Sequence, residues 1–192
     1  ESKGSVTVQE LTERFHASES TIRRDLTVLH KKGDLVKVFG GAVQNTARIS
    51  TKEEQVAFRM ELNREEKQII ARYAASLIEP DDFIYLDAGT TTWYMIPYIK
   101  EHSASFVTNA VSHALSLTEN GFRVILLGGE LKAATEAIVG NEAYVNLQKY
   151  NFTKGFFGTN GVNRFSGFTT PDINEAMIKE CAMKHTQTPY VL

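Results

Sequence analysis

Several residue types and patterns are scarce or missing in this sequence, and each absence excludes a class of protein. Among 192 residues there is one cysteine, Cys181, which excludes an intramolecular disulfide and a thiolate zinc cluster. The five histidines lack the spacing of metal ligands on one helix, so we expect no metal site. No apolar run approaches the roughly 20 residues of a membrane span, and no secretory leader opens the chain. We therefore expect a cytoplasmic protein with no cofactor and no membrane partner.

Charge of one sign and nucleotide motifs are also missing. The chain has 21 Lys and Arg against 23 Asp and Glu, a formal charge of −2. It has neither the Gly-Lys-Ser/Thr of a P-loop nor a Gly-x-Gly-x-x-Gly fingerprint that opens a helix after a strand. With 42% hydrophobic and 23% charged residues, the composition is that of a globular protein with a small and a medium domain.

Two apolar patterns near the start of the chain predict a helix and a wing. Val8, Leu11 and Phe15 lie three and four residues apart, which indicates a short supporting helix. Residues 35–41 read Leu-Val-Lys-Val-Phe-Gly-Gly, the pattern of a strand and a glycine turn. Together with the segment between them, they predict a winged helix-turn-helix DNA-binding domain over residues 1–43.

The segment between these patterns predicts the DNA contact. Ser18 is a natural N-cap, and Ile22, Leu26 and Leu29 form one apolar stripe on the helix that it would begin. The opposite face is polar and basic, so it is free to read a major groove. An Arg-Arg pair alone is more often a solvated face, but cap, stripe, basic face and wing agree here. The residues expected to contact DNA are Ser18, Ser20, Thr21, Arg23, Arg24, Thr27, Lys31 and Lys37.

Bulk charge gives this module little affinity for DNA. Residues 1–43 carry seven Lys and Arg against six Asp and Glu, although five of the seven cations fall between Arg23 and Lys37. A small module of this kind binds weakly alone. We therefore expect a homodimer or homotetramer that binds two half-sites of an operator DNA.

The rest of the chain predicts an α/β domain. Residues 44–52 are polar and aperiodic and predict a linker, after which residues 53–192 alternate between strand and helix patterns. This alternation is typical of a mostly parallel sheet with helices on both faces. The expected strands are 83–86, 105–107, 122–127, 154–157 and from 190 onward, and the expected helices are 54–62, 64–78, 93–100, 111–119, 142–149 and 173–184.

Small hydrogen-bonding residues follow four of the expected strands, where ligands bind in open parallel sheets. The turn of residues 89–92, Gly-Thr-Thr-Thr, suits an anion such as phosphate, because its backbone N–H groups converge at a helix start. Such a turn by itself is more often only a helix cap. Glu175 and Lys179 lie one helical turn apart and either face this site or form an ordinary exposed ion pair.

A set of motifs runs through nearly the whole chain. They are Ser20-Thr21-Ile22-Arg23-Arg24-Asp25-Leu26, Gly40-Gly41-Ala42, Asp87-Ala88-Gly89-Thr90-Thr91-Thr92, Val107-Thr108-Asn109, Leu127-Gly128-Gly129-Glu130 and Phe156-Phe157-Gly158-Thr159-Asn160-Gly161-Val162. With them the chain resembles the DeoR family of bacterial transcriptional repressors. The resemblance implies a winged helix joined to an effector domain similar to the ribose-5-phosphate isomerase and glucosamine-6-phosphate deaminase folds. It also implies a response to sugar phosphates.

Within the family, the motifs are most similar to those of fructose-operon repressors, with lactose and tagatose-phosphate repressors as near neighbours. The implied effector is fructose 1-phosphate. The resemblance places residues 89–92 around the phosphate, Asp87, Asn109 and Glu130 near sugar hydroxyls, and Asn160, Glu175 and Lys179 at the rim. The full set expected to bind the effector is Asp87, Gly89, Thr90, Thr91, Thr92, Thr108, Asn109, Gly128, Gly129, Glu130, Gly158, Asn160, Glu175 and Lys179.

The sequence departs from the family pattern at both ends and at two internal positions. The resemblance implies one more helix before Glu1, and an Ala-Asp-x-Ser-Lys-like segment after Leu192 that closes the sheet and adds to the pocket. Phe39 stands where many members have histidine, and Ala133-Ala134 stands where many have bulkier polar residues. These departures bear on operator affinity, ligand affinity and specificity.

Two other functions remain open on the sequence. One is a sugar-phosphate isomerase or deaminase, with Asp87, Glu130 or Glu175 as a base and Lys179 as its electrostatic partner. The attached winged helix argues against an enzyme, which has no use for it. The other is a DNA-binding protein whose second domain only dimerises, which leaves the polar strand ends unexplained.

Overall fold

A computed structural model describes residues 5–32, 35–38, 40–44 and 56–192 of the chain. It divides into two units, Glu1–Ile49 and Ser50–Leu192, and each has a hydrophobic core of its own. The linker predicted over residues 44–52 begins at Gln44, which is the last residue of a strand, and its remainder lies outside the described residues.

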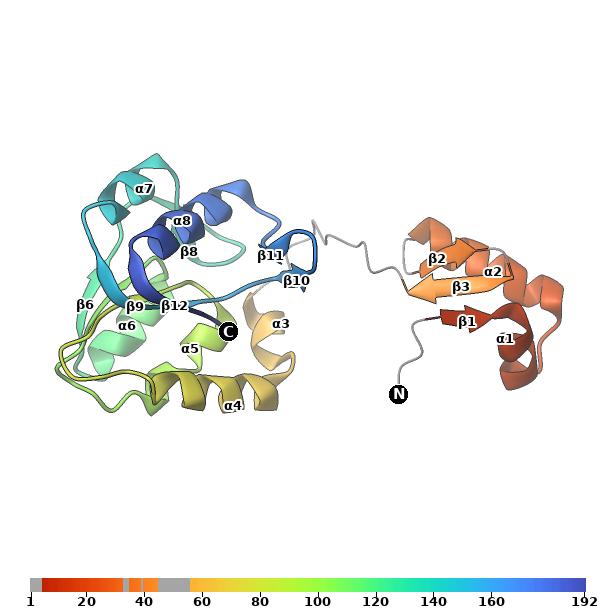
Figure 1. The fold of residues 1–192 in the computed structure, drawn as a ribbon, viewed down its shortest axis with the longest axis horizontal. Coiled ribbons are helices and arrows are strands. Elements are labelled where there is room, and N and C mark those ends of the chain that lie inside the picture. The colour runs from red at the N-terminus through yellow and green to blue at the C-terminus, as the bar shows by residue number, and fades with distance from the viewer. Residues whose placement is uncertain (1–4, 33–34, 39, 45–55) are drawn as a thin grey trace. The chain divides into compact units, whose positions relative to one another are not determined.

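The N-terminal unit combines two helices with a small antiparallel sheet of strand order β1-β3-β2 (Figure 1). The predicted supporting helix, second helix and wing are therefore confirmed, whereas β1 is too short to give a readable alternation. Its elements are β1 (Ser5–Thr7), α1 (Val8–Phe15), α2 (Glu19–Lys32), β2 (Leu35–Val38) and β3 (Gly41–Gln44).

Local chemistry fixes where these helices begin. Thr7 and Glu10 form a reciprocal capping box at α1, with the Glu10 amide donating to the Thr7 hydroxyl at 3.1 Å. Ser18 caps α2 as predicted, since its hydroxyl accepts from the Thr21 amide at 3.3 Å. Gly41 is required by close packing, because a Cβ there would lie 2.1 Å from a backbone oxygen of β1.

The core of this unit is small and only partly follows the predicted stripes. Ile22 and Leu26 of α2 are buried against Val8, and so are part of the core. Leu29, predicted on the same stripe, is 36% exposed, and Phe15 of α1 is 63% exposed. The core forms around the middle of α2, so the apolar residues farther along the helices lie beyond it.

The C-terminal unit is built on a five-stranded sheet of order β12-β9-β4-β5-β6, in which every neighbouring pair is parallel (Figure 1). The predicted parallel α/β fold is confirmed. β4 occupies the centre of the sheet, which puts the ends of β9, β4, β5 and β6 side by side. The strands are β4 (Phe83–Leu86), β5 (Ser105–Thr108), β6 (Arg123–Leu126), β9 (Phe152–Phe157) and β12 (Thr186–Val191).

Helices cover both faces of this sheet. On one face α4, α5 and α6 pack over Ile84 and Phe106, and on the other α7 and α8 pack over Tyr85 and Val107 (Figure 1). This alternation along β4 and β5 follows from the two-residue period of a strand. The helices are α3 (Val56–Glu61), α4 (Arg64–Ala75), α5 (Thr90–Trp93), the 3₁₀ helix η1 (Ile96–Tyr98), α6 (Val111–Glu119), α7 (Asn141–Leu147) and α8 (Ile173–Lys184).

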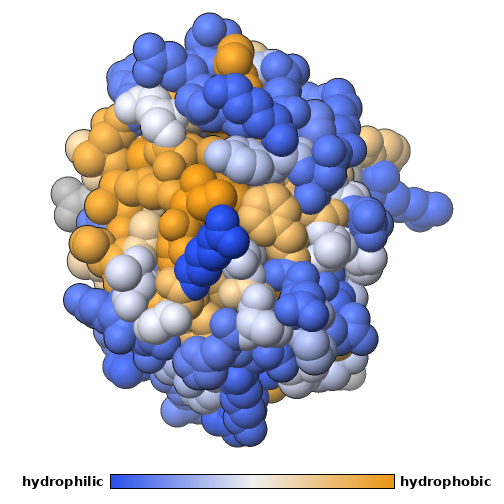
Figure 2. Space-filling view, turned by 90° about the vertical axis from the view of Figure 1, so that its left-hand side faces the viewer, coloured by the Kyte–Doolittle hydropathy of each residue, from blue (hydrophilic) through white to orange (hydrophobic). Residues whose placement is uncertain are grey.

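Apolar side chains remain exposed beside β6, the outer strand on that side of the sheet. Figure 2 looks onto this side and shows an apolar area interrupted by a hydrophilic side chain. The exposed apolar residues of β6, α6 and α7 include Leu126, Leu115 and Val145, respectively. No helix of the described residues is long and apolar enough to cross a membrane.

The structure corrects some predicted elements. The helix expected over 93–100 is wrong: α5 ends at Trp93, and a 3₁₀ turn containing Pro97 follows, because proline lacks the N–H of an α-helical bond. β12 begins at Thr186 rather than 190, and its outer position tolerates Pro189. Two antiparallel hairpins were not predicted, and they comprise β7 (Glu130–Lys132) with β8 (Ala137–Val139) and β10 (Gly161–Asn163) with β11 (Gly167–Thr169).

Candidate functional site

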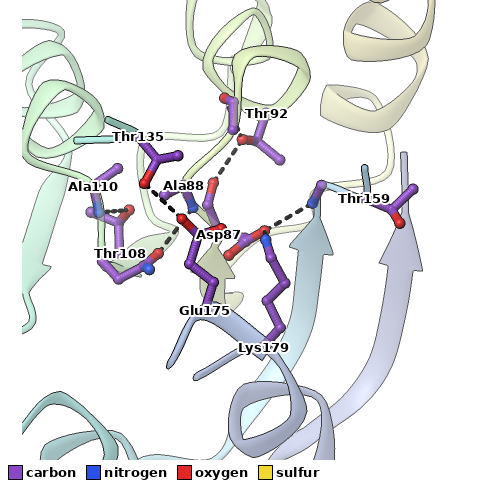
Figure 3. Close-up of polar contacts among 12 residues, drawn as sticks. Asp87, Ala88, Thr92, Thr108, Ala110, Thr135, Thr159, Glu175 and Lys179 are labelled. Atoms are coloured by element: carbon purple, nitrogen blue, oxygen red, sulfur yellow. Dashed lines mark hydrogen bonds and ion pairs between the residues drawn. The ribbon is translucent and has the colours of Figure 1, made fainter. Parts of the chain in front are cut away.

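The candidate site lies at the carboxyl end of the central strand. Asp87 follows β4 directly and is fully buried. One of its oxygens accepts from the backbone N–H of Gly158, after β9, at 2.9 Å and forms an ion pair with Lys179 of α8 (Figure 3). Strand order therefore joins three segments that are distant in sequence around one carboxylate.

Burial raises the pKa of Asp87, while the Lys179 ammonium and the Gly158 N–H act in the opposite direction. The second carboxylate oxygen is buried and has no hydrogen-bond partner among the described residues. An unpaired buried acceptor is unfavourable for stability, and such groups concentrate at functional sites.

Hydrogen bonds from buried side chains fix the turn after Asp87. Thr92 donates its hydroxyl to the Asp87 carbonyl at 2.7 Å, and His113 Nε2 lies 3.1 Å from both the Thr92 hydroxyl and the Gly89 carbonyl. Because a carbonyl only accepts, His113 carries its proton on Nε2. Burial lowers the pKa of His113 to about 4, so the imidazole is neutral near pH 7.

These hydrogen bonds leave backbone N–H groups of the turn available to a ligand. The Ala88 amide donates to the Asn109 side chain at 2.9 Å. The amides of Gly89, Thr90 and Thr91 have no assigned acceptor in the described part of the chain, as is usual for the first turn of a helix. These donors suit an anion.

Glu175 and Lys179 both face the site, but they do not pair with each other. Lys179 binds Asp87, whereas Glu175 accepts from the Thr135 hydroxyl at 2.7 Å (Figure 3). Glu175 also accepts from Lys132 at 3.2 Å. The prediction that they face the ligand site therefore agrees with the structure better than the exposed ion pair does.

A cavity of about 210 Å³ opens beside these residues. That volume lies below the roughly 300–1,000 Å³ typical of drug-sized ligands, so it suits a small ligand. It is lined by Val56, Arg59, Met60, Ala88, Gly89, Thr90, Trp93, Ser112, His113, Thr135, Glu136, Gly158, Asn160, Glu175 and Lys179.

Six of the residues predicted to bind an effector line this cavity, and they are Gly89, Thr90, Gly158, Asn160, Glu175 and Lys179. Others support it from within: Asp87 holds Lys179, and Thr92 and Asn109 fix the turn, with Asn109 also donating to the Ile138 carbonyl at 3.3 Å. Thr108 is buried, and its hydroxyl accepts from the Ala110 amide at 3.1 Å. Thr91, Gly128, Gly129 and Glu130 are not among the lining residues, so their contact with a ligand stays a prediction.

Sequence reasoning missed several lining residues. Val56, Arg59 and Met60 come from α3, which precedes the first strand of the domain and carries no strand-end signal. Ser112 and His113 lie on α6, a few residues beyond the predicted strand end. That short spacing was the one available clue. Thr135 and Glu136 lie between β7 and β8, the hairpin that the sequence did not predict.

The residues predicted to contact DNA lie on or beside α2 and β2, and none of them is buried. Arg23 is held by Glu19 at 2.5 Å, and Lys37 donates to the Thr27 hydroxyl at 2.7 Å. Arg24 and Lys31 of α2 are exposed, so both side chains suit phosphate contacts. In the described ranges, no cluster of three or more His, Cys, Asp or Glu side chains could hold a metal ion.

Comparison with known families decides the identity of both units. The family model of the DeoR C-terminal sensor domain matches residues 62–192, and that of the DeoR-like helix-turn-helix domain matches residues 1–48. The chain belongs to the DeoR family. It is a DNA-binding transcriptional regulator with a sensor domain, and every residue of the cavity lining except the three from α3 lies within the sensor-domain match.

Individual relatives of this DeoR-family chain are regulators. It is 44% identical, over 97% of its length and 74% of the relative's, to an uncharacterized HTH-type transcriptional regulator FruR of Bacillus subtilis. It is 36% identical, over 99% of its length and 76% of the relative's, to the lactose phosphotransferase system repressor of Staphylococcus aureus. Ribose 5-phosphate isomerase A of Neisseria gonorrhoeae has a similar structure, with a TM-score of 0.47, 13% identity, and coverage of 66% of this chain and 50% of that one. A likeness at that level says nothing about activity.

Proposed function

We propose that this chain represses a sugar-utilisation operon, in the first place a fructose operon, and leaves its operator when the sensor domain binds a sugar phosphate such as fructose 1-phosphate. The observation that carries the proposal is the small cavity of the sensor domain, where backbone donors, two cations and two carboxylates meet. The name of the Bacillus subtilis relative, FruR, supports fructose over the lactose alternative.

Different lining residues suit different parts of a sugar phosphate. The amides of Gly89 and Thr90 suit a phosphate, while Asn160 and Glu175 suit sugar hydroxyls. The ion pair with Asp87 holds Lys179, which lines the cavity. On this assignment the phosphate supplies affinity, and the pattern of hydroxyls supplies specificity.

The experiment is a thermal-shift panel on the chain, with each compound at equal concentration: fructose 1-phosphate, fructose 1,6-bisphosphate, tagatose 6-phosphate, ribose 5-phosphate, fructose and inorganic phosphate. Selective stabilisation by fructose 1-phosphate is expected, since a ligand that binds the folded state raises its stability by mass action. Stabilisation by tagatose 6-phosphate alone would move the proposal to the lactose group. No shift with any phosphate would contradict the sensor role.

We propose that the domain binds sugar phosphates without converting them. The raised pKa of Asp87 beside Lys179 is the observation that keeps an isomerase or deaminase as the second candidate. Incubation with the stabilising sugar phosphate, followed by NMR, should show an unchanged compound after hours. Conversion to another sugar phosphate would favour the enzyme.

We also propose that operator and effector binding oppose each other in a homodimer or homotetramer. Two half-sites need two recognition helices. Duplexes selected from a random pool should show a repeated half-site, and the operator should weaken effector binding by the same factor as the effector weakens operator binding. A chain that is monomeric in analytical ultracentrifugation, both in the absence and in the presence of operator DNA, would contradict the proposed oligomer.

A further inference from the structure

One wall of the cavity is a short helix that the known motifs do not include. Val56, Arg59 and Met60 of α3 line the cavity, at spacings of three and four that put them on one side of the helix. Phe58, between them in sequence, is 57% exposed. One side of α3 therefore belongs to the ligand site.

This helix is attached lightly to the sensor domain. None of its residues is fully buried. Tyr94 donates its hydroxyl to the Met60 carbonyl at 3.1 Å, Lys67 donates to the Arg59 carbonyl, and Met60 packs against the core. An element held by few buried contacts opens at a low cost in free energy, so a ligand contact can change how well it is ordered.

The charges of the lining single out one residue of α3. Lys179 is paired with Asp87, whereas the Arg59 guanidinium has no ion-pair or hydrogen-bond partner among the described residues. Arg59 also lies close enough to Lys67 that its charge, after the effect of burial, lowers the pKa of that lysine. An anion beside Arg59 would relieve this repulsion. Guanidinium binds phosphate oxygens through two parallel hydrogen bonds, which makes Arg59 a suitable donor.

We propose that Arg59 binds the anionic group of the effector, together with the amides of the 89–92 turn, and that this contact orders α3. The inference rests on the proposed sugar-phosphate sensor. Its second half follows from the light attachment of α3, which a contact between Arg59 and a bound anion would strengthen.

Binding of phosphates to variants tests the first half. Isothermal titration uses fructose 1-phosphate, tagatose 6-phosphate and inorganic phosphate as probes. Arg59→Ala should weaken the best-bound probe at least about tenfold, as expected for a lost charge-assisted hydrogen bond, and Arg59→Lys should lose less. The control is Arg64→Ala, because Arg64 carries the same charge nearby but pairs with Glu61 at 3.6 Å, outside the cavity lining.

The outcomes separate this inference from the function on which it rests. Binding to the unmodified chain with Arg59→Ala within twofold of it overturns the role of Arg59 and leaves the sensor intact. No binding of any phosphate to the unmodified chain overturns both. Equal weakening by Arg59→Ala and Arg64→Ala shows a general charge effect and also overturns the assignment.

Hydrogen exchange tests the second half. At a saturating concentration of the best-bound probe, amides of α3 in the unmodified chain should exchange at least severalfold more slowly, and in Arg59→Ala at saturation they should not. The turn at 89–92 should be protected in both proteins, which shows that the ligand is bound. Equal protection of α3 in both proteins would overturn the ordering of α3 through Arg59.

Discussion

Lowering the pH from 7 to 4 should destabilise the sensor domain chiefly through His113. Its imidazole is buried between the 89–92 turn and α6, and it donates from Nε2 to the Gly89 carbonyl and the Thr92 hydroxyl at 3.1 Å each. Burial lowers the pKa of His113 to about 4, against 6.5 for an unperturbed histidine. The folded state therefore holds a neutral ring at pH values where the unfolded chain binds a proton.

The sign and size of the effect follow from this difference. As the pH falls below 6.5, the unfolded state gains a proton and the folded state does not, so the free energy of unfolding decreases until the pH reaches about 4. About 2.5 pKa units at about 1.4 kcal/mol each correspond to roughly 3.5 kcal/mol of stability lost across this window. Below pH 4 the contribution is constant, because both states are protonated.

Urea unfolding at pH values from 4 to 7 measures the effect. Trp93 is the single tryptophan of the chain and lines the cavity, so its fluorescence reports on the sensor domain. His113→Gln should remove the pH-dependent loss, whatever its stability at pH 7, and the matched control His102→Gln should keep it, because His102 is exposed. The raised pKa of Asp87 acts with the opposite sign and is present in all three proteins. Parallel pH curves for the unmodified chain and His113→Gln would refute a neutral buried imidazole.

Three further predictions concern both units. Leu26→Ala should destabilise the N-terminal unit by about 2–5 kcal/mol, whereas Leu29→Ala should cost well under half of that, because Leu26 is 4% and Leu29 36% exposed. Hydrogen exchange of α1 and α2 measures both losses of stability, and equal losses would contradict the described core. Arg24→Ala should weaken operator binding and lower the slope of log affinity against log salt by about one, with effector binding unchanged; anisotropy titrations check this, and loss of both activities would indicate misfolding. Asp87→Asn should destabilise the sensor domain by about 3–5 kcal/mol, because Lys179 is left without its partner, and adding Lys179→Met should recover part of this in urea unfolding without restoring ligand binding.

Much of the fold was readable from local patterns. Three features depend on neighbours in sequence and can therefore be predicted without knowledge of the fold. They are the N-cap at Ser18, the stripe of Ile22 and Leu26, and the alternation of strand and helix patterns after residue 53. The predictions of elements failed where proline or a very short strand length determined the local structure. Pro97 broke a helix pattern, and the three-residue strands of the hairpins carry too few residues for an alternation to be seen.

The candidate site was readable only in outline. Because ligands bind at the carboxyl ends of parallel strands, the sequence alone indicated the turn at 89–92. The spacing of Glu175 and Lys179 favoured an exposed ion pair, and only the family resemblance placed them at the ligand site. The sequence did not distinguish residues that line the cavity from residues that hold it. Asn109 and Thr92 have the polar side chains of a ligand site, yet both are buried and bonded to the backbone.

The sequence by itself determined the family, the order of the two domains and the type of the longer helices and strands, since these depend on local spacing and on motifs that stand in the chain. The tertiary structure decided which charges meet. Asp87 pairs with Lys179, and Glu175 pairs with Lys132, because the strand order β9-β4-β5 brings α8 and the β7–β8 hairpin to one edge of the sheet. It also put Arg59 and His113 at the cavity. No periodicity marks such residues, since their roles depend on partners that are far away in sequence and close only in the folded chain.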